Sequence, residues 1–409
     1  MDRIDGGVTS PKGFRASAVR AGLKKEGLDL VVLECPSGAA CAGLFTSNAV
    51  KAAPVLVSMR SLKRSRGRVR AVVVNSGNAN ACNGSRGLDD AGNVASKCAQ
   101  LLGTSVWKVL LASTGVIGRP LPLAKVLAGL ELAIPNLDSS RAASRAAAQA
   151  IMTTDRVPKE AAVMVKYKAG SFVIGGMAKG VGMIHPNLAT MLCLVTTDAR
   201  IEAGPLARAL KEAADRSFNM ISVDRDTSTN DTLLAMASGL SSSPPVRAKG
   251  QAFGLFKDAL SEVCISLAKQ MVRDGEGATK IFEVEVSGAR SLSDARLCAR
   301  SIAGSNLVKS AVFGCDPNWG RILAAAGYSG ASIDQDVVKV SLETPDGRSM
   351  EWVAGGQQIS EDRNEAARKF LGEESFRIKL DLGLGRFRAT AWGCDLTYDY
   401  VKVNSEYTT

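Results

Sequence analysis

A glycine-punctuated loop that runs directly into an apolar strand constrains this chain more than any other segment. Residues 179–189 begin with Lys179 and contain two glycines, and residues 190–195 read Thr-Met-Leu-Cys-Leu-Val. The apolar run predicts a buried strand, and the glycines predict a turn before it. Thr190 therefore stands at the boundary between a polar loop and a strand of the core.

Thr190 is a candidate for both nucleophile and base. If the peptide bond between Ala189 and Thr190 broke, Thr190 would carry a free α-amine beside its own hydroxyl. An α-amine has an unperturbed pKa of about 7.7–8.0, which suits general-base catalysis near neutral pH, and a nearby ammonium such as Lys179 would lower that pKa. The chain has one histidine, His185, and no evident Ser-His-Asp arrangement, which favours position 190.

Residues 179–192 resemble the self-cleavage motif of the ornithine acetyltransferase family, also called the glutamate N-acetyltransferases of arginine biosynthesis. Members of that family cut themselves before the threonine of a Lys-Gly-x-Gly-Met-Ile-x-Pro-Asn-x-Ala-Thr-Met-Leu motif, and this chain has every fixed residue of it. Further matches lie at residues 5–9, 75–81, 226–232 and 315–321, and we interpret these as mainly architectural or supporting the pocket. The resemblance covers essentially the whole chain.

The resemblance implies an α/β (α+β) fold of the Ntn-like ornithine acetyltransferase type, with mixed sheets packed by helices and a smaller C-terminal α/β domain. Cleavage would give an α chain, residues 1–189, and a β chain, residues 190–409. We expect residues 1–189 to form the N-terminal part of the catalytic core and residues 190–280 to complete it. Residues 281–409 would form the smaller domain, with a tail that returns to the active site.

The implied activity is a ping-pong acetyl transfer from N2-acetyl-L-ornithine to L-glutamate, through an acetyl group held on Thr190. The expected partners are these small molecules and the protein's own α and β chains in an α2β2 heterotetramer. Neither a metal nor a bound cofactor is expected, and the sequence leaves open whether acetyl-CoA is a co-substrate. We expect neither nucleic-acid nor membrane partners.

Specific residues follow from the matched motifs. The resemblance assigns the oxyanion hole to Thr114 and Gly115. They lie between a predicted strand and a proline-started helix, where glycine lets the backbone approach a ligand closely and a helix N-terminus offers N–H groups. Ala189 and Thr190 are the cleavage residues. The residues assigned to substrate contact are Thr153, Lys179, Thr190, Glu276, Asn404 and Thr409.

Two positions depart from the family pattern. Val181 stands where the family often has serine, which can alter the hydrogen bonding of the precursor's loop. Arg225 stands where the family usually has glycine, which puts the backbone geometry or the charge there in question. Neither position is among the residues assigned to chemistry.

Two rival functions stay open at this point. A self-cleaving aminopeptidase or amidohydrolase would share the N-terminal nucleophile but pass the acyl group to water. A basic nucleic-acid-binding protein would use the net charge of +11 and one basic run. That run has no interleaved aromatic residues, so a solvated loop and strand edge is the simpler interpretation; it consists of Arg60, Lys63, Arg64, Arg66, Arg68 and Arg70.

The remaining composition predicts a cytoplasmic protein with reduced thiols. The nine cysteines are scattered without any Cys-x-x-Cys pair, which supports neither a zinc site nor a disulfide framework. No apolar run reaches the roughly 18 residues of a membrane span, and residues 1–5 do not resemble the start of a signal peptide.

Hydrophobic periodicity predicts alternating strands and helices. Strands are predicted at residues 28–34, 53–58, 70–75, 108–112, 162–167, 172–176, 190–197, 281–286, 307–313, 337–342, 376–382 and 387–392. Helices are predicted at residues 88–102, 120–133, 139–151, 205–218, 230–238, 251–273, 293–303, 319–326 and 361–370.

Overall fold

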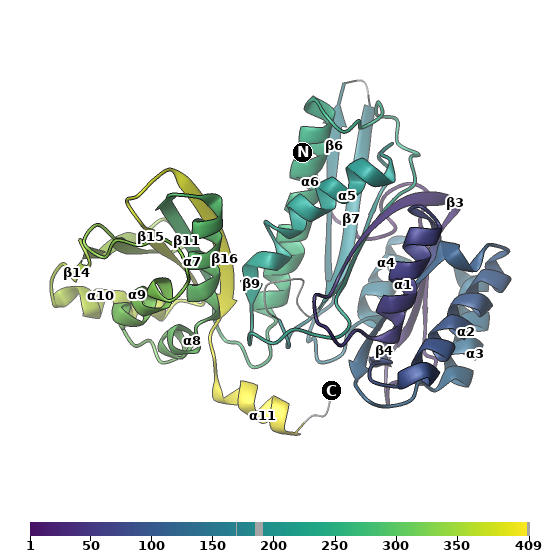
Figure 1. The fold of residues 1–409 in the computed structure, drawn as a ribbon, viewed down its shortest axis with the longest axis horizontal. Coiled ribbons are helices and arrows are strands. Elements are labelled where there is room, and N and C mark those ends of the chain that lie inside the picture. The colour runs from purple at the N-terminus through teal and green to yellow at the C-terminus, as the bar shows by residue number, and fades with distance from the viewer. Residues whose placement is uncertain (169, 185–190, 407–409) are drawn as a thin grey trace.

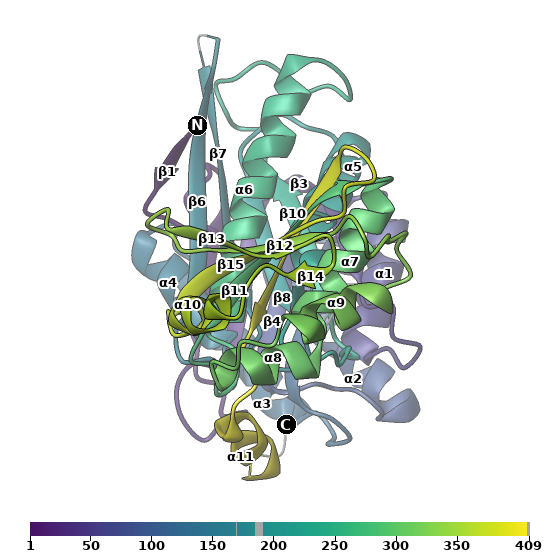
Figure 2. The ribbon, with the colours of Figure 1, turned by 90° about the vertical axis from the view of Figure 1, so that its left-hand side faces the viewer.

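The computed structural model describes residues 1–168, 170–184 and 191–406. Figure 1 shows two lobes, a larger one that contains the N-terminus and a smaller one built mostly from the C-terminal part of the chain. A last helix, α11 (Tyr398–Glu406), leaves the smaller lobe and runs below the larger one (Figures 1 and 2). None of the described helices is both long enough and apolar enough to cross a lipid bilayer.

The larger lobe is built on one mixed sheet. Its nine strands, counted over the described residues, lie in the order β1 (Asp2–Ile4), β6 (Lys159–Tyr167), β7 (Gly170–Lys179), β8 (Leu192–Thr197), β10 (Thr232–Ala237), β3 (Leu30–Phe45), β4 (Arg68–Asn78) and β5 (Val109–Val116), with β2 (Arg15–Val19) beside β3. The β8–β10 and β4–β5 pairs are parallel and the other pairs antiparallel.

Strand β3 bends and folds the sheet on itself. Its pairing with β4 shifts register between Glu34 and Ala39, and Gly38 in this bulge has a φ of +77°, a conformation that glycine adopts without strain. The first part of β3 pairs with β2 and β4, and the last part pairs with β10. Side chains of β4 and β5 share one buried cluster with those of β7, β8 and β10. The two parts of the sheet therefore lie face to face.

Helices cover the outer sides of the folded sheet. Helices α1 (Ala53–Arg64), α2 (Gly84–Leu102) and α3 (Leu123–Ala133) pack on the β3–β4–β5 part. Helices α5 (Ala203–Ala214) and α6 (Gln251–Arg273) pack on the other part, and α4 (Arg141–Ala150) contributes to the cluster between the two. This layering leaves the strand ends at one edge free to form a site.

The smaller lobe holds a second mixed sheet. Over the described residues it has seven strands in the order β14 (Gln357–Gln358), β13 (Ser349–Ala354), β12 (Lys339–Glu343), β15 (Ser375–Asp381), β11 (Ile281–Ala289), β16 (Phe387–Cys394) and β9 (Ile221–Ser222). Its helices are α7 (Leu292–Gly304), α8 (Asn306–Phe313), α9 (Trp319–Gly327) and α10 (Asp362–Leu371).

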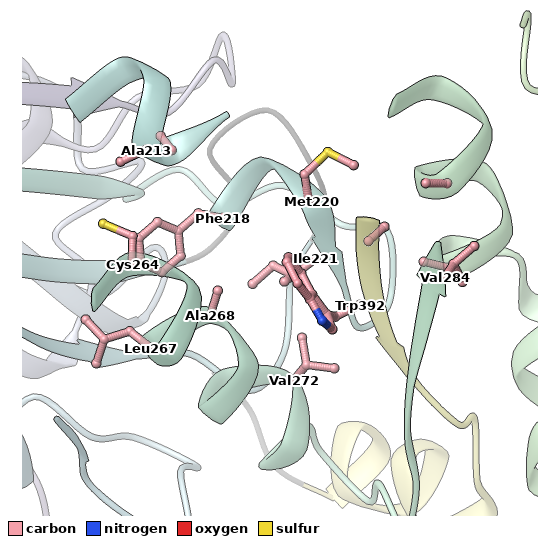
Figure 3. Close-up of a cluster of buried hydrophobic side chains, with 14 of the residues drawn as sticks. Ala213, Phe218, Met220, Ile221, Cys264, Leu267, Ala268, Val272, Val284 and Trp392 are labelled. Atoms are coloured by element: carbon pink, nitrogen blue, oxygen red, sulfur yellow. The ribbon is translucent and has the colours of Figure 1, made fainter. Parts of the chain in front are cut away.

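The two lobes share one hydrophobic core. Figure 3 shows Trp392 of β16 beside Ile221 of β9 and Val272 of α6. The same buried cluster continues from β11 and α7 to α5 and the outer side of β8. Burial of apolar area is the main stabilising term in folding. Burial of this shared cluster therefore holds the two lobes together, just as buried apolar side chains stabilise each lobe.

The predicted fold class, mixed sheets packed by helices with a smaller C-terminal α/β unit, is confirmed. The proposed boundary between residues 280 and 281 coincides with the first residue of β11, although the second sheet also includes β9 from earlier in the chain. The division of the chain into residues 1–189, 190–280 and 281–409 stays a prediction.

Three predicted elements were of the wrong type. Residues 53–58 begin helix α1, which has Pro54 in its first turn, the position that tolerates proline best. Residues 307–313 form α8, because the Ser305 hydroxyl accepts from the Val308 N–H and caps a helix there. Residues 230–238 contain strand β10 despite good helix formers, because the strand pairs on both sides, with β3 and β8.

The basic run is a solvated surface. Arg60, Lys63 and Arg64 lie on α1 rather than in a loop, and five of the six side chains are exposed. Arg70 pairs with the buried Glu34 at 2.9 Å, and the Arg64 guanidinium stacks on Trp107 at 4.4 Å from the ring centre. Two of the six basic side chains, Arg64 and Arg70, therefore have partners within the protein itself.

Candidate active site

A cleft in the larger lobe collects the predicted site residues from distant parts of the sequence. It encloses about 700 Å³ of empty space, part of it open to solvent. Among the residues that line it are Thr114, Gly115, Thr153, Lys179, Glu276 and Asn404. Ala189, Thr190 and Thr409, which complete the predicted set, lie outside the described residues.

The cleft lies at the ends of β5 and β7 and at the start of β8, strands that come from the two facing parts of the sheet. Thr114 is near the end of β5, and Lys179 is the last residue of β7. Lys179 pairs with Leu192, the first residue of β8, so β8 starts two positions after Thr190. The fold thus brings the oxyanion-hole candidates and the lysine to the edge at which β8 begins.

Lys179 is a buried ammonium held by two threonine hydroxyls. Its Nζ donates to Thr153 Oγ1 at 2.8 Å and to Thr114 Oγ1 at 3.2 Å, and the residue is 4% exposed. Burial lowers the pKa of Lys179, while the nearby Asp155 carboxylate opposes that shift. The lysine therefore connects the predicted oxyanion hole to the predicted substrate threonine.

Gly115 has a backbone conformation that other residues rarely adopt. Its φ is +129°, and a Cβ at this position would lie 2.4 Å from the Gly77 carbonyl carbon and 2.5 Å from the Asn78 nitrogen. Both are main-chain atoms of the neighbouring strand β4, which cannot move aside as a side chain could. Glycine is thus required at the predicted oxyanion hole for a steric reason.

Glu276 is fixed from two sides. Its Oε1 accepts from the Thr154 hydroxyl at 2.8 Å, and its Oε2 accepts from the Asn404 amide at 2.9 Å. A Cβ on Gly182 would lie 2.5 Å from the same carboxylate, so glycine at this position leaves room for Glu276. Thr154 was not among the predicted site residues, although it directly follows Thr153.

Helix α11 brings the C-terminal region to the cleft. Asn404 contacts Glu276, and Tyr400 lines the cleft and donates a hydrogen bond to Asp224 at 3.4 Å. The helix is anchored at its start, where the Thr397 hydroxyl donates to the Gly277 carbonyl and accepts from the Tyr400 N–H. A frayed tail, the usual behaviour of a terminus, is therefore not found up to residue 406.

Asp224 is a site residue that sequence reasoning did not assign. Its two oxygens accept from the N–H groups of Met183, at 2.5 Å, and Ile184, at 2.8 Å. Burial raises the pKa of Asp224 to about 6, although these hydrogen bonds oppose the shift. The contacts hold the loop that leads to position 190. No sequence pattern links residue 224 to residues 183–184, so only the tertiary contact could identify it.

Asp231 lies at the start of the central strands. Its Oδ1 accepts from the Met191 N–H at 3.0 Å, and the residue is 1% exposed. Burial raises the pKa of Asp231 well above its usual range, against the hydrogen bonds from Met191 and Thr46. It belongs to the polar run 226–232, which the sequence indicated as lining or supporting a pocket without assigning a role to this residue.

The backbone conformation of Arg225 is one that suits the glycine which the resembled family usually has at this position. Its φ is +72°, a left-handed conformation that costs a non-glycine residue roughly 1–2 kcal/mol. We expect the R225G variant to be more stable than the R225A variant by about 1 kcal/mol, because alanine keeps the backbone penalty and glycine removes it. Chemical unfolding of both variants measures the difference. Equal stabilities would show that this backbone is unstrained.

The charges of the cleft suit a small amphoteric ligand. Among the described residues that line the cleft are three carboxylates, Asp224, Asp226 and Glu276, and one lysine, Lys179. Carboxylates can hold an amine and the lysine can hold a carboxylate. In the part of the chain that the structure describes, no group of three or more His, Cys, Asp or Glu side chains is arranged to hold a metal ion.

Comparison with known proteins gives one consistent family. The ArgJ family model matches residues 15–409. An arginine biosynthesis bifunctional protein ArgJ from Symbiobacterium thermophilum is 49% identical over 412 residues, 100% of each chain. A glutamate N-acetyltransferase from Methanothermobacter thermautotrophicus is 46% identical over 410 residues, 99% of this chain and 98% of its own. The solved ornithine acetyltransferase of Mycobacterium tuberculosis, complexed with ornithine, is 40% identical and covers 46% of this chain and 97% of its own, with a TM-score of 0.42.

Proposed function

The chain belongs to the ArgJ family, and from this premise we propose that it transfers the acetyl group of N2-acetyl-L-ornithine to L-glutamate. The observation that carries the proposal is the convergence of six predicted residues, separated by up to 290 positions, in one cleft; they are Thr114, Gly115, Thr153, Lys179, Glu276 and Asn404. The relatives' names, glutamate N-acetyltransferase and arginine biosynthesis bifunctional protein, support the same reaction.

The first step is self-cleavage. The Thr190 hydroxyl attacks the Ala189 carbonyl carbon, and the peptide C–N bond breaks to leave an ester and a free α-amine. Water then hydrolyses the ester, which yields a carboxylate on Ala189 and restores the hydroxyl of Thr190. The products are an α chain of residues 1–189 and a β chain of residues 190–409.

Acetyl transfer then follows a ping-pong course. The α-amine of Thr190 takes the hydroxyl proton as the oxygen attacks the acetyl carbonyl, and Thr114 and Gly115 stabilise the oxyanion that forms. The amide C–N bond breaks, the proton passes to the leaving nitrogen, and ornithine departs. The α-amine of glutamate next attacks the acetyl-threonine ester, and N-acetylglutamate leaves with the enzyme restored.

The proposed reaction needs no resident cofactor, because Thr190 supplies both nucleophile and base. Acetyl-CoA is the second donor to test, since it would acylate the same threonine and release a thiol. The many free thiols, seven of them buried, fit a reducing compartment, and we place the enzyme in the cytoplasm on that ground.

The two chains stay together after cleavage in this proposal. Residues from both sides of position 190 share the buried clusters of the larger lobe, so separation would expose a large apolar area. By family resemblance the pairs assemble further into an α2β2 heterotetramer. Light scattering of the cut enzyme measures that assembly.

Intact mass spectrometry tests the proposal directly. Purified protein should give two chains, with the break before Thr190, and exposure to N2-acetylornithine should add one acetyl group to the β chain. Added glutamate should remove that group as N-acetylglutamate. Removal by water at the same rate would instead support an aminopeptidase or amidohydrolase, and an unmodified single chain would overturn both.

We expect the E276Q variant to discriminate poorly between cationic and neutral side chains. Glu276 is the cleft carboxylate that we assign to the ornithine side-chain ammonium, and a charge-assisted hydrogen bond of this kind is worth about 1.5–3 kcal/mol. Its kcat/KM for N2-acetylornithine should fall about tenfold or more, with a smaller loss for an N-acetyl amino acid whose side chain is neutral.

The N404A variant is the matched control for this measurement. It removes one hydrogen bond to Glu276 and leaves the carboxylate charge in place, so the preference for the cationic substrate should persist. Unchanged discrimination in the E276Q variant would remove Glu276 from the role we give it.

A further inference from the structure

A chain of buried charges extends from Lys179 away from the cleft. Lys179 Nζ lies 4.0 Å from Asp155 Oδ2. Asp155 Oδ1 accepts from Lys159 Nζ at 2.7 Å, and Lys159 Nζ also donates to Asp274 Oδ2 at 2.7 Å. The four side chains are between 0% and 5% exposed. Acidic and basic groups alternate along this chain, from the substrate cleft to the end of α6.

Asp155 is the member that joins this chain to the site. Besides Lys159, it accepts from the Thr153 N–H at 3.1 Å and from the Gly180 N–H at 2.9 Å. Thr153 and the residue before Gly180 are two of the cleft residues described above. One carboxylate therefore fixes both the segment that carries the substrate threonine and the segment that carries the lysine.

We propose that Asp155 is a positioning residue that keeps the buried Lys179 protonated and aimed at Thr114 and Thr153, and that Lys159 opposes it. The inference rests on the proposed function and deepens it, because it names what sets the charge of the cleft's ammonium. Asp155 touches no substrate in this scheme and acts through Lys179.

The electrostatics of the cluster give the sign of each effect. Burial lowers the pKa of Lys179, the negative charge of Asp155 raises it, and the positive charge of Lys159 lowers it further. Burial raises the pKa of Asp155, but Lys179 and Lys159 outweigh burial and leave that pKa below the usual range. The charged groups that face Lys179 are Asp155, Lys159, Glu276, Asp231 and Lys24.

The charge of Lys179 matters for two steps of the proposed reaction. As an ammonium it attracts a substrate carboxylate and lowers the pKa of the Thr190 α-amine, so that the amine is free to accept a proton. Once Lys179 loses its proton at high pH, both effects disappear. The alkaline limb of the kcat/KM profile therefore reports on this lysine.

The test uses two substitutions with opposite expected signs. The D155N variant keeps the shape of the side chain and removes its charge, so the alkaline limb should move to lower pH by about one unit. The K159M variant removes the opposing positive charge, so the limb should move to higher pH. A residue that only stabilises the fold would lower activity at every pH and would not shift the limb in two directions.

Two further variants separate charge from packing. The D155E variant keeps the charge and should keep the limb at its wild-type position even where kcat falls. The R156M variant removes another partner of Asp274, at 3.0 Å on the exposed outer side of the chain, and should leave the limb unchanged. With these two results, a shift of the alkaline limb is assigned to the charge at residue 155 and not to packing.

A direct readout makes the test independent of activity. In protein labelled with ¹³C-lysine, the Cε resonance of Lys179, identified by its loss in the K179M variant, should titrate at lower pH in the D155N variant and at higher pH in the K159M variant. Unshifted or equally shifted titrations overturn the inference even if acetyl transfer is found. Shifted titrations without acetyl transfer would support the inference and refute the proposed function.

Discussion

The T190A variant should remain one uncut chain of 42.8 kDa and lose acetyl transfer by at least about 10⁴-fold, the scale on which removal of a nucleophile acts. Alanine has no hydroxyl to attack the Ala189 carbonyl, so neither the β-chain N-terminus nor the acetyl ester can form. A denaturing gel, N-terminal sequencing and the mass of the acetylated β chain measure the three losses separately.

The T190S variant is the control for this result. Serine keeps a hydroxyl and, after cleavage, an α-amine, so it should be cut and should accept acetyl, with reduced rates. A T190A protein that is still cut before position 190, or that still transfers acetyl at the wild-type rate, would require a nucleophile elsewhere in the chain.

The G115A variant should lose both activity and stability. An added Cβ would meet main-chain atoms of Gly77 and Asn78 at 2.4–2.5 Å, and the φ of +129° is one that alanine rarely adopts. Relief requires β5 to move away from β4, which displaces the N–H group at the predicted oxyanion hole. Loss of one such donor lowers kcat by about 10²–10³-fold, and the strain should destabilise the fold by roughly 2–4 kcal/mol.

Gly118 offers the matched control for Gly115. It lies just after β5, three residues beyond Gly115, and also has a positive φ, +79°, but a Cβ there would meet nothing within 4 Å. The G118A variant therefore measures the backbone penalty alone and should keep its kcat. Steady-state kinetics and thermal unfolding compare the two variants. Equal losses in both would mean that close approach to β4 is not what requires glycine at 115.

The strand that follows the glycine-punctuated loop was predicted correctly from its local sequence. The loop at 179–192 predicted a strand, and β8 begins at Leu192. Glycine at 115 was expected to let the backbone approach a ligand, and that role stays a prediction; what the structure shows there is the close approach of β5 to β4. The three mistaken elements were decided by other features: Pro54 in the first turn of α1, the capping serine of α8, and the pairing of β10 with strands on both sides.

The supporting residues escaped prediction because their partners are far away in sequence. Asp224 holds residues 183 and 184, and Asp274 holds Lys159, across intervals of 40 and 115 residues. Nothing local to any of these residues marks the contact. Burial makes these contacts important, because the stability of an ammonium or carboxylate removed from water depends on the few groups that face it.

The sequence by itself determined the family, the candidate nucleophile and six of the cleft residues, because reacting groups require particular residue types in a fixed local order. The tertiary structure alone decided which residues hold those groups in place. The bend of β3 brings the end of β5 to the start of β8, and the Asp155 carboxylate then lies beside a buried lysine. Such contacts depend on how strands fold back in space, which no local pattern of residues records.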